Sequence, residues 1–195
     1  MLYTIARWTL FPLLRLVFVR TVTGVENLPS TGPYIIASNH ASYGDAPLLV
    51  AALDPHAKGK IHFVAWKALA KVWLLRWMIP AFGGVFENGS IDKLLDLLLH
   101  GHVVGIYPEG GRTHNGKIQK ITHSGTGVLA ADSGAPVIPV KTIGLYELWP
   151  YNKLLPRISK SIEFRIGKPL HYKGRTRKKD HVQFGNKVMK EIDAL

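Results

Sequence analysis

Two short polar segments of the sequence carry side chains whose types and spacing suit acid–base chemistry. The first, SNHASYGDAP, places His40 five residues before Asp45. Along one helix these side chains would face different ways, but a turn eased by Gly44 can bring them together. A carboxylate on Nδ1 fixes the imidazole tautomer and leaves Nε2 to take a proton from a hydroxyl group. The spacing predicts a general base with its orienting partner, and a helix-capping pair is the alternative.

The second polar segment, PEGGRTHNGK, combines glycines with charged side chains. Gly110 and Gly111 allow backbone amides to approach an anion, and Arg112 offers a planar guanidinium to a phosphate or carboxylate. Glu109 is placed to pair with that guanidinium. The segment predicts an anion-binding loop, and an ordinary turn with a surface Glu–Arg pair is the alternative.

The surrounding sequence predicts the elements that position these segments. Mostly apolar runs bounded by Gly, Pro or polar residues indicate strands at 34–38, 61–65, 102–107, 137–143 and 161–166. Helical patterns lie between them at 45–53, 67–77, 91–99 and 125–131. This alternation predicts an α/β fold, with a single domain built on a largely parallel central sheet flanked by helices. Ligands of such sheets bind beyond the carboxyl ends of the strands, where both polar segments begin.

Composition narrows the classes of function. A chain of 195 residues, 47% of them hydrophobic, is long enough to bury a core. The absence of cysteine excludes disulfides, cysteine-ligated zinc and a cysteinyl intermediate. The net charge of +12 favours an anionic partner, which is nucleic acid, an anionic membrane surface or a phosphate-bearing substrate. Nucleic-acid binding is not expected, because the aromatic residues do not alternate with cations on an exposed strand.

The first 23 residues are expected to form an apolar and basic membrane-interface segment, ahead of a domain over residues 24–195. Arg7 and Arg15 interrupt the apolar stretch LYTIARWTLFPLLRLVFV, which makes a membrane span costly and a signal peptide a poor fit. On one helix these arginines form a basic seam beside aromatic and leucine side chains, which favours a helix lying in the membrane interface. Packing on the domain is the alternative. The tryptophans and cations of residues 66–77 admit the same two interpretations.

Taken in order, these segments resemble the glycerolipid acyltransferase family, which includes the lysophosphatidic acid acyltransferases. SNHASYGD matches the family's NHxxxxD block, and YPEGGR at residues 107–112 is close to its FPEGTR block. APVIPV at residues 135–140 resembles its VPVIPV-type strand, and the resemblance runs from about Val25 to the C-terminus. It implies transfer of a fatty acyl group from acyl-CoA or acyl-carrier protein to the hydroxyl of a lysophospholipid. The expected acceptor is 1-acylglycerol-3-phosphate, which would give phosphatidic acid.

The resemblance also implies a role for each matched residue. His40 would be the general base, and Asp45 would orient it. The acceptor would be bound by residues of both segments, namely Asn39, Glu109, Gly110, Gly111 and Arg112. The acyl thioester would serve as co-substrate, so no metal, cofactor or covalent enzyme intermediate would be needed. A binding module that keeps the fold without turnover is the alternative.

The sequence departs from the family's second block, which usually ends in an arginine thought to hold the acceptor phosphate. The segment GGVFENG places Gly89 at that position and supplies no cation. Cations elsewhere would then bind the phosphate: Arg112, Lys117, Lys120 or His123. A different lysolipid acceptor is the alternative. Because the substrate must be taken from a bilayer, we expect a peripheral or monotopic protein on the cytoplasmic face of an anionic membrane.

Overall fold

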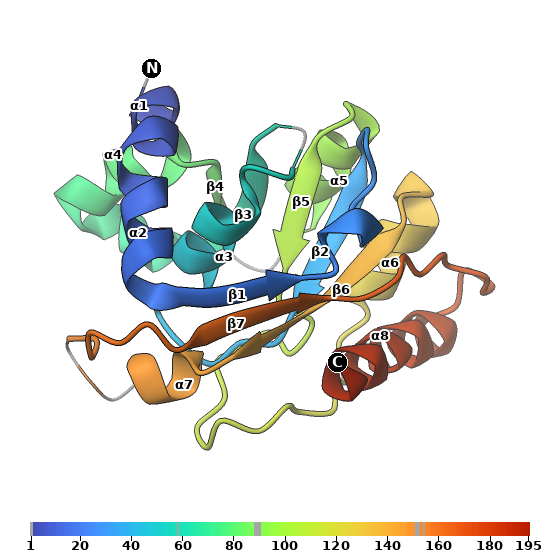
Figure 1. Ribbon diagram of the computed structural model, residues 1–195. Helices are drawn as coiled ribbons and strands as arrows, with labels where there is room; N and C mark the ends of the chain where they lie inside the picture. Colours follow the sequence, from blue (N-terminus) through green and yellow to red (C-terminus); the bar gives the residue numbers. More distant parts are fainter. Residues whose placement is uncertain (1, 58, 88–90, 151–152, 154) are drawn as a thin grey trace.

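The computed structural model describes residues 2–57, 59–87, 91–150, 153 and 155–195. Its centre is a seven-stranded sheet with the order β1-β7-β6-β2-β5-β3-β4 (Figure 1). The pairings between these strands are parallel except for β6 with β7. The strands are β1 Val19–Thr23, β2 Tyr34–Ser38, β3 Ile61–Trp66, β4 Gly84–Glu87, β5 Val103–Ile106, β6 Val137–Ile143 and β7 Ile162–Ile166.

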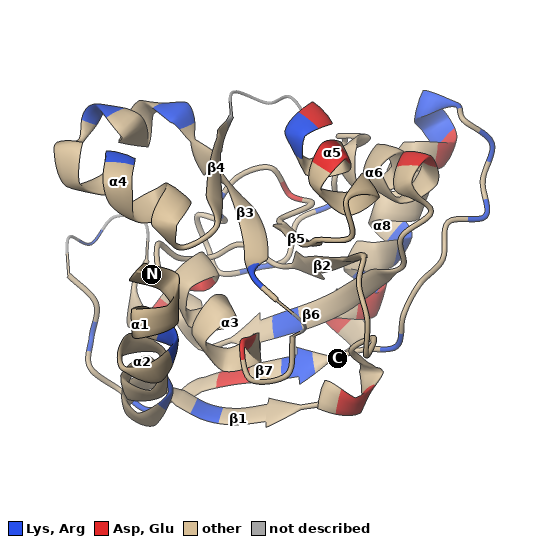
Figure 2. Cartoon of the chain, turned by 90° about the horizontal axis from the view of Figure 1, so that it is seen from above, with Lys and Arg blue, Asp and Glu red and all other residues tan. Residues whose placement is uncertain are grey.

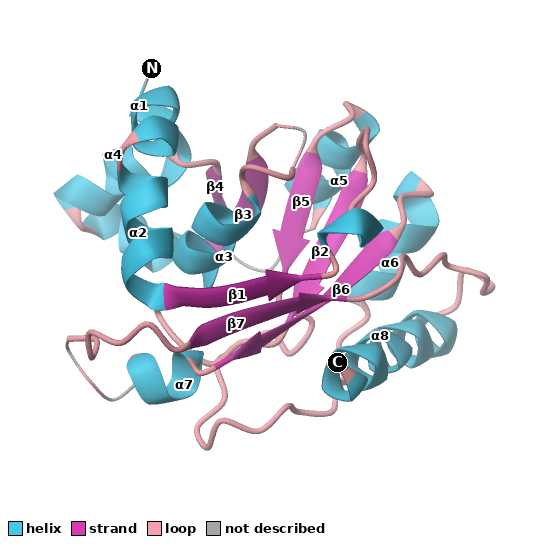
Figure 3. Ribbon diagram, viewed as in Figure 1, coloured by secondary structure: helices cyan, strands magenta, loops and turns pink. Residues whose placement is uncertain are grey.

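Helices cover both faces of the sheet (Figure 3). One apolar cluster contains Ile36 of β2 with α1, α2 and α3, and the other contains the adjacent Ile35 with α5, α6 and α8. Both isoleucines are fully buried, which explains why β2 is continuously apolar. The helices are α1 Leu2–Trp8, α2 Leu10–Phe18, α3 Asp45–Leu53, α4 Trp73–Ala81, α5 Asp92–Leu99, α6 Gly125–Ser133, α7 Leu145–Leu148 and α8 Lys178–Ala194, with 3-10 turns η1 Val25–Asn27 and η2 Lys67–Lys71.

The predicted α/β fold with a largely parallel sheet is confirmed, and β2, β6 and α3 have the predicted bounds. The prediction of one helix over residues 67–77 is wrong. The chain forms η2, becomes extended at Val72 (φ −84°, ψ 114°) and only then enters α4. Val72 is β-branched, and such residues favour the extended conformation over the helix.

The N-terminal residues are partly built into the domain. β1 is an edge strand that pairs with β7, so the expected boundary between residues 23 and 24 follows a strand of the same sheet. The Tyr3 hydroxyl donates to the Asp54 carboxylate at 2.6 Å, and Arg7 forms an ion pair with that carboxylate at 2.8 Å. The expected seam of Arg7 and Arg15 along one helix is therefore wrong, because Arg7 binds the domain and the helix is interrupted at Thr9. Within the described ranges, no helix combines the length and apolar content that crossing a bilayer requires.

Candidate active site

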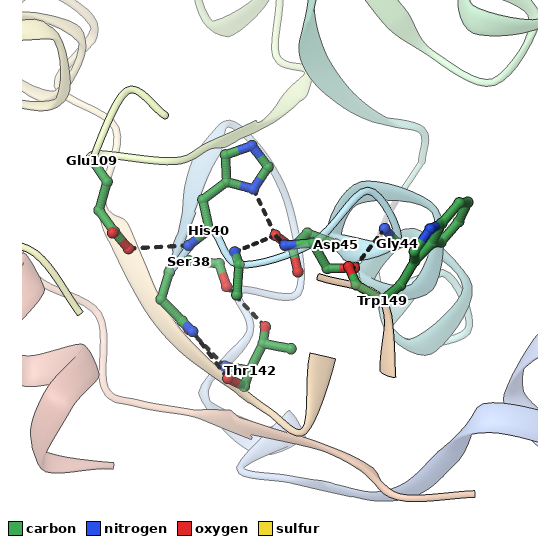
Figure 4. Close-up of polar contacts among 10 residues, drawn as sticks. Ser38, His40, Gly44, Asp45, Glu109, Thr142 and Trp149 are labelled. Atoms are coloured by element: carbon green, nitrogen blue, oxygen red, sulfur yellow. Dashed lines mark hydrogen bonds and ion pairs between the residues drawn. The ribbon is translucent and has the colours of Figure 1, made fainter. Parts of the chain in front are cut away.

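The two polar segments meet at the carboxyl-terminal edge of the sheet. They follow β2 and β5, which are adjacent parallel strands, so both segments begin at the same edge. Both backbone groups of His40 are bonded to the second segment. Its N–H donates to the Glu109 carboxylate at 3.0 Å (Figure 4), and its carbonyl accepts the Thr113 N–H at 2.8 Å. The backbone of the candidate base, in the first loop, is therefore hydrogen-bonded through both its N–H and its carbonyl to the second loop, which is far away in the sequence.

The candidate base and its orienting partner are in contact. His40 Nδ1 lies 2.6 Å from Asp45 Oδ2 (Figure 4). The same oxygen accepts the backbone N–H groups of Ala41 at 2.6 Å and Ser42 at 2.8 Å, which fixes the carboxylate. The side chain of Asp45 is 1% exposed, whereas that of His40 is 23% exposed. Because the carboxylate binds Nδ1, Nε2 is left to accept a proton from a substrate.

An aromatic stack lies against one face of the His40 imidazole. The ring of Tyr107 lies 4.1 Å from that of His40 at an interplanar angle of 13°, and Phe63 stacks on Tyr107 at 5.5 Å. A Cβ atom at Gly105 would collide with the Phe63 ring. Burial, with a contribution from the Asp45 carboxylate, raises the pKa of Tyr107 well above its ordinary value, so its hydroxyl stays neutral. The stack limits the tilt of the imidazole.

The turn between His40 and Asp45 is held by a serine that the sequence analysis did not single out. Ser42 is 1% exposed. Its hydroxyl donates to the Trp149 carbonyl at 2.8 Å and accepts the Gly44 N–H at 3.0 Å. A small residue with a hydroxyl inside a glycine-containing turn was the available signal, since serine commonly bonds nearby backbone groups in turns.

The structure gives Asn39 a positioning role. Its amide nitrogen donates to the Thr142 carbonyl at 3.0 Å, and its amide oxygen accepts the Thr142 N–H at 2.8 Å. These bonds continue the pairing of β2 with β6 for one residue beyond Ser38. Each end of the amide thus bonds to the backbone of β6, and the expectation that Asn39 binds the substrate stays a prediction.

The expected Glu109–Arg112 pair is wrong. One oxygen of Glu109 accepts the His40 N–H, and the other is buried without a hydrogen-bond partner. Burial, with a smaller contribution from Asp45, raises the pKa of Glu109 to about 7, although the backbone N–H groups of His40 and Gln119 lower it. Glu109 therefore holds the backbone of the candidate base, and its pKa of about 7 is near neutrality.

Arg112 lies instead on an aromatic ring of the first loop. Its guanidinium carbon is 3.7 Å from the centre of the Tyr43 ring, which identifies a cation–π contact. The structure therefore brings Arg112 to the same pair of loops as the candidate base, although not through the contact that the sequence suggested.

The other predicted binding residues lie along the second loop and beyond it. Gly110 has a φ of +73°, a conformation that favours glycine, and its Cα faces the His123 ring. A Cβ atom added at Gly111 would point into open space. Lys117 and Lys120 are exposed, and Lys117 lines a cavity of about 460 Å³ whose lining includes Asn39 and Lys141 but not His40. Gly89, where the family has its arginine, lies outside the described residues.

The part of the chain that the structure describes has no group of three or more His, Cys, Asp or Glu side chains that could hold a metal ion. The expectation that the reaction needs neither a metal nor a cofactor stays a prediction.

Comparisons with known proteins identify the family of this chain. The family model described as Acyltransferase matches residues 19–142, which include both loops. The chain belongs to this acyltransferase family. The resemblance seen in the sequence is thereby confirmed.

Several relatives of this acyltransferase-family chain are 1-acyl-sn-glycerol-3-phosphate acyltransferases. The one from Bacillus subtilis is 32% identical over 155 residues, which cover 75% of this chain and 71% of the relative. The chloroplastic protein LPAT1 from Arabidopsis thaliana is 25% identical over 160 residues, or 77% of this chain. The match spans only 43% of that relative and 38% of the chloroplastic BAT2 of Brassica napus.

A solved structure has the same fold. The crystal structure of the 1-acyl-sn-glycerophosphate (LPA) acyltransferase PlsC from Thermotoga maritima superposes with a TM-score of 0.75. The alignment covers 98% of this chain and 83% of that protein at 24% identity. The arrangement of strands and helices described above is therefore that of a known acyltransferase fold.

Proposed function

We propose that this protein transfers a fatty acyl group from acyl-CoA or acyl-carrier protein to the hydroxyl of a lysophospholipid, with 1-acylglycerol-3-phosphate as the acceptor. The observation that carries the proposal is the 2.6 Å contact between His40 Nδ1 and the buried Asp45 carboxylate. Support for the acceptor comes from the names of the relatives, which act on 1-acyl-sn-glycerol-3-phosphate.

In the proposed reaction, His40 Nε2 takes the proton of the acceptor hydroxyl while its oxygen attacks the thioester carbonyl. The tetrahedral intermediate then collapses, the carbon–sulfur bond breaks, and the thiolate leaves with the proton from the imidazolium. Asp45 keeps the imidazole in the productive tautomer and stabilises its cationic form. General-base catalysis by a positioned histidine contributes about 10²–10⁴ in rate. The products are the diacylated lipid and a free thiol.

We also propose that the protein binds the cytoplasmic face of an anionic membrane through α1, α2, η2 and α4. Trp8 on α1 is 77% exposed, and Trp73 and Trp77 on α4 are 75% and 67% exposed. η2 and α4 also carry cations, namely Lys67, Lys71 and Arg76 (Figure 2). Exposed aromatic side chains flanked by Lys and Arg are typical of surfaces that lie in a membrane interface.

Co-sedimentation with vesicles tests this membrane proposal. The protein should bind vesicles rich in anionic lipid more strongly than neutral vesicles, and Trp73→Ser with Trp77→Ser should weaken binding to both. Equal binding of parent and variant would contradict a role for α4. Tight, salt-dependent binding to oligonucleotides in place of vesicles would favour the nucleic-acid alternative.

The acyl-transfer proposal is tested by incubating purified protein with labelled acyl-CoA or acyl-carrier protein and a panel of lysolipids. We expect labelled phosphatidic acid as the main product. His40→Ala should lower kcat about 10²–10⁴-fold. The control is His171→Ala, which removes an exposed imidazole outside both loops and should retain activity. Lysolipid binding without product from either donor would instead identify a binding module.

A further inference from the structure

A cation–π contact joins the two loops that carry the candidate site. The Arg112 guanidinium lies over the face of Tyr43, and no Asp or Glu among the described residues forms an ion pair with it. Tyr43 itself is 50% exposed. A guanidinium stacked by its face keeps the N–H groups along its edge available for an oxyanion, and arginine remains charged at any physiological pH.

Tyr43 belongs to the turn that connects His40 with Asp45, the proposed catalytic pair. It lies between His40 and Asp45 in the sequence, and its ring packs 5.6 Å from that of Trp149. The Trp149 carbonyl accepts the Ser42 hydroxyl, so the residue next to Tyr43 is anchored to the same segment. The turn that fixes the imidazole therefore also fixes the ring on which the guanidinium rests.

The contact also restricts a long side chain. Arginine has many rotamers, and ordering it on binding a ligand costs free energy. A ring face that already holds the guanidinium reduces this cost. Arg112 belongs to the second loop, so the stack holds its guanidinium against the loop that carries His40.

We propose that Tyr43 is a positioning residue, which holds Arg112 on its ring so that the guanidinium binds the phosphate of the acceptor and directs the acceptor hydroxyl to His40. This inference rests on the proposed acyl transfer to a phosphate-bearing lysolipid. To the expected role of Arg112 in binding the phosphate, it adds a residue of the first loop that holds the guanidinium in place.

The test compares Tyr43→Leu, Tyr43→Phe, Arg112→Gln and the double variant Tyr43→Leu/Arg112→Gln. Each is measured with a short-chain lysophosphatidate and with the uncharged monoacylglycerol of the same chain. Arg112→Gln should raise KM for the lysophosphatidate about tenfold or more, because it removes a charge-assisted bond. Tyr43→Leu should raise it about two- to sixfold, the range that cation–π contacts at exposed sites account for. KM for monoacylglycerol and for the acyl donor should stay within about twofold of the parent.

Two comparisons separate positioning from a general structural role. Tyr43→Phe keeps the ring face and should restore the lysophosphatidate KM. In the Arg112→Gln background, Tyr43→Leu should have almost no further effect, because a residue that acts through Arg112 has nothing left to position. Additive effects of the two substitutions, or a rise in KM for the uncharged acceptor as well, would overturn the inference.

Calorimetric titration of the same two lipids keeps this inference distinct from the proposed acyl transfer. The parent should bind the lysophosphatidate more tightly than the monoacylglycerol, and Tyr43→Leu and Arg112→Gln should each reduce that preference. If the parent shows no preference, or if Arg112→Gln retains it, phosphate recognition by this pair is wrong even if acyl transfer occurs. Absence of product with the preference intact would instead refute the acyl-transfer proposal alone.

Discussion

The two loops that meet at His40 differ in how deeply their polar side chains are buried. In the loop after β2, the polar side chains of Asn39, Ser42 and Asp45 are buried and bonded to backbone groups. In the loop after β5, Glu109 and Thr113 contact the first loop, whereas most residues from Gly110 to Lys120 are exposed. The difference indicates that the first loop fixes the reacting geometry and the second presents charges to a ligand. Substitutions in the first should alter rate and stability, and those in the exposed part of the second should alter recognition.

The largest effect is expected from Asp45→Asn. An amide in place of the carboxylate still fits the turn but no longer favours the productive tautomer or the imidazolium, so kcat should fall about 10²–10⁴-fold. KM should change by less than about threefold, since Asp45 is too buried to touch the acceptor. Steady-state kinetics measures both, and Asp96→Asn, on an exposed side chain of α5, is the matched control. An equal loss in rate and in binding would assign Asp45 a structural role only.

Ser42→Ala should have the next largest effect, on stability. It removes the donor to the Trp149 carbonyl and the acceptor of the Gly44 N–H in a buried turn. Leaving such groups unpaired costs about 1–3 kcal/mol in the free energy of unfolding. Urea denaturation measures this cost, and Ser133→Ala on α6, which also removes a hydroxyl bonded to backbone, is the comparison. If Ser42→Ala lowers kcat and Ser133→Ala does not, the turn is required for the catalytic geometry. If Ser42→Ala leaves the free energy of unfolding unchanged, the first loop is less rigid than its contacts imply.

Glu109→Gln should change the pH dependence of stability. The pKa of Glu109 is raised from 4.5 to about 7, so the folded protein binds a proton that the unfolded chain releases. The resulting stabilisation is fully present below about pH 4.5 and is lost as pH rises through about 7. Glutamine has no such titration, so this fall should disappear from urea denaturation curves taken across that range. Glu191→Gln, on an exposed residue of α8, should retain it. The same slope in Glu109→Gln as in the parent would contradict the raised pKa.

The smallest effect is expected from Lys120→Gln in the exposed part of the second loop. Substitution of an exposed side chain usually changes the free energy of unfolding by less than about 0.5 kcal/mol. If Lys120 contributes to recognition through charge alone, KM for an acidic substrate should rise at low salt and return to the parent value at high salt. A large fall in kcat at unchanged KM would show that the second loop also shapes the reacting geometry beyond Glu109 and Thr113.

Much of this fold was predictable because its central strands are buried on both faces. Continuous apolar runs such as β2 and β6 are recognisable without tertiary information. β1 was missed because its five residues, VRTVT, directly follow an apolar helix and include three polar side chains, so only pairing with β7 identifies it as a strand. The amphipathic pattern of α8, which buries Phe184, Val188 and Ile192, was present in the sequence and was overlooked.

The site was predictable where a contact depends on local spacing. His40 and Asp45 are separated by one turn, so residue types and a glycine were sufficient to predict their approach. Contacts between the loops were not predictable. Glu109 and Arg112 are near in sequence, but the sheet brings Glu109 to the His40 backbone and Arg112 to Tyr43. Local pairing therefore suggested the wrong partner for both side chains.

The bonds from Glu109 and Thr113 to the backbone of His40 have a practical consequence for redesign. Replacing the whole second loop to obtain a new headgroup preference would also displace the imidazole. If the proposed acyl transfer is correct, an engineered change of selectivity would then be accompanied by slower turnover. Libraries that keep these two anchors and randomise residues 114–120 should separate the two properties.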